Sequence, residues 1–515
     1  MTRHQWTKLL LVALVLLTNE VSQAFTPPSS TSYSPCFNAY HRQAQQQQQQ
    51  RWGSKSRLFS SLDGDESSEG DRRRRRVFSE LALAGVGLSV TIGTAEFNDQ
   101  DYGLWGILPT GRKSRKTIRE TIVPGQLWTF DQKFGILNVQ VPLRMTVIKL
   151  KGGGLLVYNP VAATRECFSL LRELVDEYGP VKHIVVGSVA LEHKAYAGVL
   201  AQKCRSAQVW LTPGQYSFPV NLPNPFLGFP VSRTQMMPKS IDEAPAEWKE
   251  SGIDFDVLGP IISRDGAFGE TVLFHQPTST LVVTDTCLQV TDEVPAIYES
   301  DPSPLLYHAR DTVTDVVDKT PETFRKGWRR VVLFGLFFTP SAITIKDVND
   351  ALAERRPDIN SDYAGIYPWD WTGDEEASWK GLTGTGPKGG PLVAPILQVL
   401  LLNRSPVEVL DFADRVAQWP IKRIIPAHLK NNLQLTGADY RGAFGFLEES
   451  GVPNGFPRPL KADLQTLLDA EQSLIASGAI VPAPGKVGGK LSRSELIDRT
   501  VYRCRKNVCA PRAQP

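Results

Sequence analysis

Short apolar runs separated by Gly, Pro and Asn begin near residue 125 and continue to about residue 435. In the segment 145–159, MTVIKLKGGGLLVYN, a glycine turn lies between two apolar runs, which predicts a β-hairpin. The next segment, TRECFSLLRELVDEYG, has apolar residues at helical spacing between Thr164, a predicted N-cap, and Gly179, a predicted stop. A strand, a helix and a strand are then predicted at 183–188, 193–204 and 207–213. This alternation predicts a sheet covered by helices.

The second half of this region has the same pattern with longer connections. The runs TVLFH at 271–275 and STLVVTDT at 279–286 predict another hairpin, and 411–419 and 422–428 predict a helix followed by a strand. Residues 290–405 between them form a less regular insertion, in which GWRRVVLFGLFF at 327–338 is apolar enough for a buried helix. The stretch 367–391 predicts a long loop, and 460–478 predicts a helix in a C-terminal extension, 436–515.

Composition agrees with a globular protein. The chain has 515 residues, of which 41% are apolar and 22% are charged, and six cysteines are too few for a disulfide framework. The formal net charge is +3, and the run RRRRR at 72–76 alone exceeds that total. The remainder is close to neutral, so we predict no nucleic-acid partner.

The first 124 residues predict targeting segments rather than a folded domain. Residues 1–24 have a basic start, an apolar run too short for a comfortable membrane span, and small residues before Ala24, which predicts a signal peptide. Residues 25–95 are rich in Ser, Gln and Arg, as transit peptides are, and residues 96–124 predict a linker. We expect no transmembrane span in the mature protein.

The junction of Ala24 with Phe25 resembles the bipartite presequences of algae with secondary plastids. The run that begins DRRRRRVF and ends at Ala95 resembles a twin-arginine signal, although a basic transit-peptide end followed by a short helix explains it equally well. The resemblance implies a plastid protein, in the stroma or in the thylakoid lumen.

Candidate chemistry lies where predicted strands end. Glu192 and His193 follow the strand at 183–188, Asp285 ends the second hairpin, and His428 ends the last strand. Each one alone has an ordinary structural explanation, as a helix-start acid, a core histidine, a turn residue or a loop residue. Strand ends are nevertheless where α/β enzymes usually carry their sites.

The order of these motifs resembles the metallo-β-lactamase-like superfamily. The segments LWTFDQ, LEHK, FHQPTSTLVVTD and IIPAHL further resemble a branch found in plants, algae and cyanobacteria that is known only as a domain of unknown function. The resemblance covers residues 125–435 and implies an α/β fold, an αβ/βα sandwich, with the site at strand ends between two sheets.

The superfamily's metal motif, His-x-His-x-Asp-His, matches residues 188–193, where Ser188 and Ala190 replace its first two histidines. The middle histidine, expected near residues 265–266, is also absent. The resemblance implies that every ligand private to one of two metals is lost and that the ligands of the other remain. This set consists of Glu192, His193, Asp285 and His428. Two imidazoles and two carboxylates suit one divalent ion, zinc first, with iron or manganese as alternatives.

His275 ends the strand next to the one that carries Asp285, so it is a candidate general acid or base, or else a polar residue that bonds to its own turn. The functional hypothesis is a plastid metallo-hydrolase-like protein that cleaves an ester, thioester, amide or phosphoester of a small-molecule substrate, with Asp285 and His275 as catalytic residues. The alternative is a non-catalytic scaffold that binds a ligand or a photosynthetic protein partner through residues 290–405. Trp369, Trp371 and Trp379 are the candidate contacts in that case.

Overall fold

The computed structural model describes most of the chain from residue 115 to residue 484. The described residues are 100, 115–136, 138–215, 224–263, 266–356, 358, 365–386 and 389–484. The predicted signal peptide, 1–24, and transit region, 25–95, lie outside the described residues.

The first of two main sheets has seven strands, in the order β1-β2-β3-β4-β5-β6-β7. Neighbours are antiparallel from β1 to β4 and parallel from β4 to β7. Antiparallel neighbours can be joined by tight turns, whereas parallel ones need crossovers, which helices supply here. The strands are β1 Ile118–Val123, β2 Leu127–Ile136, β3 Val139–Lys149, β4 Leu155–Tyr158, β5 Val181–Val186, β6 Gln208–Leu211 and β7 Thr234–Met236.

The second main sheet has four strands, in the order β13-β10-β9-β8. The hairpin predicted from residues 271–286 is confirmed, because β9 and β10 pair in antiparallel register, while β10 and β13 are parallel. The strands are β8 Ile253–Ser263, β9 Gly266–His275, β10 Thr280–Val283 and β13 Arg423–Pro426.

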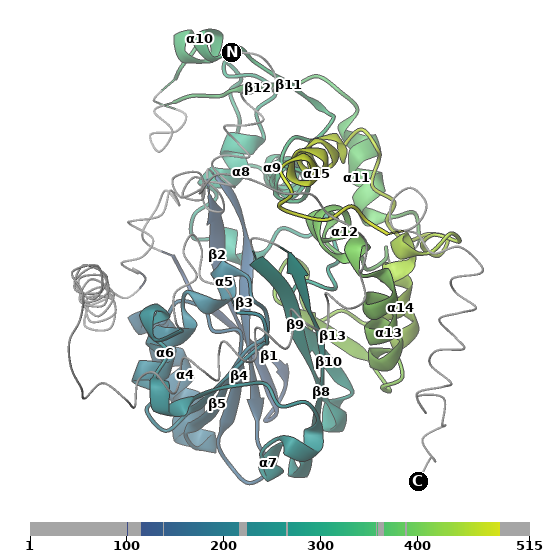
Figure 1. Cartoon of the computed structure of the whole chain (residues 1–515). Helices are drawn as coiled ribbons and strands as arrows, with labels where there is room; N and C mark the ends of the chain where they lie inside the picture. Colours follow the sequence, from purple (N-terminus) through teal and green to yellow (C-terminus); the bar gives the residue numbers. More distant parts are fainter. Residues whose placement is uncertain are drawn as a thin grey trace, which may run out of the picture.

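The two sheets pack face to face (Figure 1). One buried cluster contains Leu156 and Val185 from the first sheet together with Leu273 and Val282 from the second. Their neighbours in sequence point the other way because side chains alternate along a strand. Val157 and Val186 therefore pack outward on α4 and α6, and residues of the second sheet pack on α9, α12 and α13. The predicted αβ/βα sandwich is confirmed.

Helices cover both outer faces, and several begin and end where the sequence predicts. In α4, Arg165–Tyr178, the Thr164 hydroxyl accepts a hydrogen bond from the Cys167 N–H, and Gly179 ends the helix. The predicted helix at 193–204 is instead two short helices. The helices of the crossovers and of the insertion are α5 Leu191–Lys194, α6 Ala197–Lys203, α7 Ala246–Glu250, α8 Ser303–His308, α9 Pro321–Phe337, α10 Val348–Ala353, α12 Pro395–Leu400 and α13 Pro406–Val416.

Two predictions about irregular segments are wrong. Residues 118–123, assigned to a linker, form β1, and the predicted loop 367–391 contains β12, Trp369–Trp371, and α11, Glu375–Thr383. The helix forms because the Asp374 carboxylate accepts the Ala377 N–H, and β12 pairs with β11, Ile343–Ile345.

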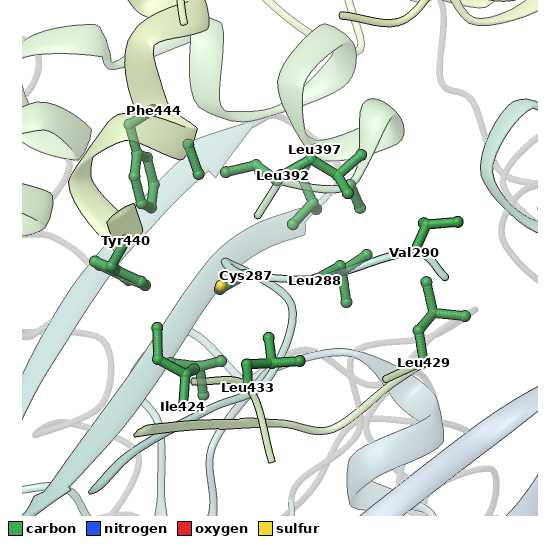
Figure 2. Packing of buried hydrophobic residues seen from close by; sticks show 14 of the residues in the cluster. Cys287, Leu288, Val290, Leu392, Leu397, Ile424, Leu429, Leu433, Tyr440 and Phe444 are labelled. Atoms are coloured by element: carbon green, nitrogen blue, oxygen red, sulfur yellow. The ribbon is translucent and has the colours of Figure 1, made fainter. Parts of the chain in front are cut away.

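Described residues of the C-terminal extension pack onto the second sheet's helical layer. Tyr440 and Phe444 lie beside Cys287 and Ile424 (Figure 2). They come from α14, Gly437–Gly442, and from the short helical turn that follows it. The predicted helix within 460–478 is α15, Gln465–Ala476, which contacts α12.

We predict that Gly187→Ala destabilises the fold severely. A Cβ at Gly187 would lie 2.2 Å from the Tyr158 hydroxyl oxygen. Tyr158 is fully buried and donates to the Thr271 carbonyl, so its ring cannot move aside without breaking that bond. Overpacking of this kind costs about 1–3 kcal/mol or more of unfolding free energy, measurable by urea denaturation. Gly152→Ala is the control, because a Cβ there meets nothing within 4 Å. An equal loss in the two variants would contradict the prediction.

Candidate metal centre

The turns that follow β4, β5 and β10 are joined by one buried side chain. The Asn159 carboxamide accepts the Gly187 N–H at 2.7 Å and donates to the Thr284 hydroxyl at 2.9 Å. Asn159 has a φ of 50°, a left-handed conformation that asparagine adopts more readily than most residues. The turn bearing Asp285 is thereby fixed relative to the turn that leads into α5.

Glu192 and His193 lie in α5, directly after that turn. His193 is fully buried and Glu192 is half-buried. Neither belongs to a strand, so their positions depend on how the turn at 187–190 is held. At the first two motif positions, Ser188 donates a hydrogen bond to Asp285 Oδ2 at 3.4 Å, and the Ala190 N–H bonds back to the Ser188 hydroxyl.

His428 follows β13 and is oriented by the backbone of the other sheet. Its Nδ1 lies 3.0 Å from the Pro142 carbonyl oxygen. A carbonyl only accepts, so Nδ1 carries the proton, and in the neutral ring the lone pair is on Nε2, which lies within hydrogen-bond distance of His193 Nε2. This is the arrangement that metal-binding histidines usually have.

The buried Arg144 of β3 holds the loop that carries His428. Its guanidinium donates to the carbonyls of Pro426 and Leu429, at 2.6 and 3.1 Å, and pairs with the Asp131 carboxylate at 2.7 Å. Leu429 has a φ of 57°, which is rare for a leucine and persists because its neighbours determine it.

These elements place Glu192 and Asp285 each beside the same pair of histidines, His193 and His428. The Nε2 atoms of His193 and His428 are 3.2 Å apart. Asp285 Oδ1 lies 3.8 Å from the first nitrogen and 3.4 Å from the second. Among the described residues, ligand atoms of Glu192, His193 and His428 lie within 4.8 Å of one another and could hold a metal ion.

The donor set suits a small divalent cation. Two ligands about 2.1 Å from a tetrahedral ion are about 3.4 Å apart, which agrees with the separations among His193, His428 and Asp285. One feature departs from the usual arrangement, because His193 Nδ1 is buried and has no hydrogen-bond partner among the residues that the structure describes. The spacing of three donor atoms therefore fits a tetrahedral metal ion, but the His193 ring lacks the hydrogen bond at Nδ1 that usually orients a metal-binding histidine.

The electrostatics of the group favour a positive charge. Burial raises the pKa of the Asp285 carboxyl, but the two imidazoles outweigh burial and hold this pKa well below its ordinary value. Burial also lowers the pKa of His428, yet the charges of Asp285 and Glu192 outweigh it and raise this pKa above the ordinary value. The carboxylates thus attract a cation or a proton into the same place.

Glu270 of β9 is a second buried carboxyl near Asp285 that the sequence analysis did not select. Burial and then the charge of Asp285 raise its pKa to about 8, while hydrogen bonds from Thr284, Asp285 and Thr286 act in the opposite direction and favour the ionised form. Glu270 and Arg144 share one sequence signal, a lone charged residue within an apolar strand, which is costly unless partners are present.

His275 does not lie where the sequence analysis expected it. It pairs with Thr280 at the start of β10, five residues before Asp285, which corresponds to about 16 Å of extended strand. Its Nδ1 lies 2.8 Å from the Thr278 hydroxyl. The expectation that it faces the site is therefore wrong, and its environment is the hairpin turn.

The tryptophans proposed as contacts for a protein partner are not free on the surface. Trp369 and Trp379 are buried, and Trp371 is half-buried with the Arg330 guanidinium 4.1 Å from its ring centre. Within the part of the chain that the structure describes, no helix is long and apolar enough to span a membrane.

One family model matches the chain. The model of a domain of unknown function, DUF4336, matches residues 124–446. No curated protein matches the chain.

Several solved structures are similar at low identity. A metallo-beta-lactamase from Pontibacter korlensis is 9% identical, with 64% of this chain and 99% of that chain covered and a TM-score of 0.31. A metallo-beta-lactamase from Hirschia baltica is 12% identical, with 36% and 78% covered and a TM-score of 0.26. A mutant flavo di-iron protein from Thermotoga maritima is 10% identical, with 66% and 64% covered and a TM-score of 0.32. Because these TM-scores are low, the evidence for the layer architecture is the pairing of this chain's own strands and the packing of its own cores.

We predict that the burial of His275 makes the fold less stable in mild acid. Its pKa is lowered by burial to about 4, so between about pH 6.5 and pH 4 the unfolded chain takes up a proton that the folded chain does not. Stability is unaffected above that window and is lost as the pH falls through it. His275→Asn should therefore reduce the loss of unfolding free energy between about pH 7 and pH 5 by about 2 kcal/mol. Urea denaturation at the two pH values measures this, and an unchanged loss would contradict it.

Proposed function

The chain belongs to the DUF4336 family, and we propose that it is a metal-dependent hydrolase with one divalent ion at the centre described above. The ligands are Glu192, His193, Asp285 and His428. The ion is zinc in the first instance, because two imidazoles with carboxylates suit zinc and also accept iron or manganese.

The observation that carries this proposal is the convergence of two imidazole Nε2 atoms 3.2 Å apart beside an ionised carboxylate. His428 is held in the tautomer that binds metals by the Pro142 carbonyl. A pair of histidines that served only for packing would not need this orientation. The order of motifs along the chain, which resembles the metallo-β-lactamase-like superfamily, adds support.

Each residue of the proposed site has a separate role. When bound, a divalent ion supplies a water molecule of lowered pKa as the nucleophile. His193 and His428 provide neutral donors, and Asp285 stays ionised at neutral pH because the two imidazoles lower its pKa. The Ser188 hydroxyl donates a hydrogen bond to Asp285 Oδ2, and Oδ1 is the carboxylate oxygen that lies near the histidine nitrogens. His275 has no role in the proposed reaction, because its side chain hydrogen-bonds to Thr278, next to the turn at the other end of β10 from Asp285.

The substrate class that fits is a small molecule with an ester, thioester, amide or phosphoester bond. Each of these reacts by attack of an activated water on a carbonyl carbon or on phosphorus.

A non-catalytic scaffold is the second candidate, and one observation favours it. The buried His193 Nδ1 has no hydrogen-bond partner, as expected if the site has lost part of the support that an active metal centre keeps. Metal binding without turnover of any ester, thioester, amide or phosphoester would favour this candidate.

We further propose a plastid location, on the basis of residues 1–95, and membership of the plant, algal and cyanobacterial branch, on the basis of the segments LWTFDQ, LEHK, FHQPTSTLVVTD and IIPAHL. Sequencing the N-terminus of the mature protein tests the location. A start near Glu96 is expected for the thylakoid lumen, and a start between Phe59 and Asp63 for the stroma. An intact N-terminus at Met1 would contradict both.

The metal site predicts one zinc ion per chain. After the protein is supplemented with zinc and loosely bound metal is removed, elemental analysis should give close to one equivalent of zinc per wild-type chain. The double variant His193→Ala, His428→Ala should retain almost none, because only the two carboxylates remain. His275→Asn is the control, since it changes a buried histidine outside the centre. Equal metal contents in the wild type and the double variant would exclude the site.

Zinc affinity should fall as the pH is lowered. A proton on His428 competes with the metal, and because the pKa of this ring is raised by Asp285 and Glu192, the competition begins above the ordinary pKa of 6.5. Zinc dissociation constants measured between about pH 8 and pH 6 should increase steadily toward the lower value. Constant affinity over this range would mean that His428 is not a ligand.

A further inference from the structure

Glu270 lies within β9, fully buried, and its carboxylate is surrounded by donors from a single turn. The backbone N–H groups of Thr284, Asp285 and Thr286 donate to it at 2.9, 2.9 and 3.0 Å. The Thr286 hydroxyl is also 2.7 Å away. The side chain thus binds the turn on which Asp285 is carried.

The backbone around Glu270 contacts the other ligand-bearing turn. Ser188 and Glu270 form an isolated antiparallel bridge. On either side of it, the Thr271 N–H donates to the Gly187 carbonyl at 2.8 Å, and the Val189 N–H donates to the Gly269 carbonyl at 3.3 Å. The turn that leads into α5, and so to Glu192 and His193, is therefore bonded to the same stretch of β9.

We propose that Glu270 is a positioning residue of the metal centre, which fixes Asp285 against the two histidines by binding the 284–286 turn with its carboxylate. This inference rests on the proposed metal site. The side chain acts on one ligand-bearing turn and the backbone on the other, so Glu270 sets their relative position. It does not itself contact the reacting atoms.

Geometry alone makes a glutamine a poor substitute here. A carboxylate can accept all four of these hydrogen bonds, whereas a carboxamide has one oxygen, and its NH₂ group would face N–H donors. Glu270→Gln therefore breaks the contact with at least part of the turn while preserving side-chain volume.

The rival explanation is that Glu270 stabilises the fold and nothing more, and the chain contains a matched residue for comparison. Asp463 is also fully buried, and its Oδ1 accepts the Ser341 N–H, the Ser341 hydroxyl and the Ser378 hydroxyl at 2.7, 2.7 and 3.0 Å. It joins the C-terminal extension to the helical insertion. Asp463→Ala removes the acceptor of all three bonds, so it should lower stability without any effect specific to the metal centre.

The test titrates the full chain with Zn²⁺ alone and measures the dissociation constant at neutral pH. We expect Glu270→Gln to weaken Zn²⁺ binding about 10- to 100-fold, as removal of groups that orient metal ligands usually does. Asp463→Ala should bind Zn²⁺ like the wild type, even where its melting temperature falls as far as that of Glu270→Gln. Substitution with Co²⁺ gives a second readout, because its visible absorption reports ligand geometry, and the band should shift in Glu270→Gln only.

The outcomes separate this inference from the proposed function. A wild-type chain that binds no Zn²⁺ overturns both. A wild-type chain that binds Zn²⁺, together with a Glu270→Gln variant of the same affinity and the same Co²⁺ spectrum, overturns the positioning role and leaves the site intact. Equal weakening of Zn²⁺ binding in Asp463→Ala also overturns the positioning role.

Thr286→Val decides the question if Glu270→Gln does not fold. Valine keeps the shape of threonine and removes one donor to the carboxylate, so Zn²⁺ binding should weaken about 3- to 10-fold. Unchanged Zn²⁺ affinity in this variant contradicts the positioning role.

Discussion

Burial of polar and charged groups where the two sheets meet is the constraint on which the rest of this structure depends. An unpaired charge inside a protein is far too costly to persist, so each such group needs specific partners. Arg144 has Asp131 and two loop carbonyls, Glu270 has four donors, and Asn159 joins two turns. These partners come from strand-end turns distant in sequence, and satisfying them fixes the turns. The ligand geometry is a consequence of this pairing.

The sequence predicted much of the layer architecture because apolar periodicity reports burial directly, as in α4 and in the β9–β10 hairpin. It also predicted Glu192, His193, Asp285 and His428 as ligands, and the structure places Glu192 and Asp285 each beside the two histidines. Strand ends are marked in sequence by the change from apolar to polar residues, so residues of this kind can be found. The helix α11 was missed because many glycines in 367–391 outweighed the capping aspartate.

The expectations that failed required information about register or about contacts across the chain. A shared hairpin suggests that His275 lies near Asp285. In the observed register, however, His275 pairs with Thr280 next to the turn, whereas Asp285 follows the other end of β10. Arg144 contacts Pro426, 282 positions further along the chain. Nothing in a single sequence indicates such a pairing, although a charged residue in an apolar strand does indicate that a partner exists.

The balance of charge at the centre explains why histidines and carboxylates are combined there. Glu192, Asp285 and Glu270 supply up to three negative charges, while two neutral imidazoles supply none. The donors around Glu270 disperse its charge, whereas the partners of the Asp285 carboxylate among the described residues are the Ser188 hydroxyl and the imidazoles. A cation between the rings would satisfy both nitrogens and the carboxylate together, and without it a proton on His428 is the alternative, as the raised pKa of that ring indicates. A proton and a cation therefore compete for the same site between the two rings. Glu270 and Arg144 help to maintain that site, because they hold the turns on which Asp285 and His428 lie.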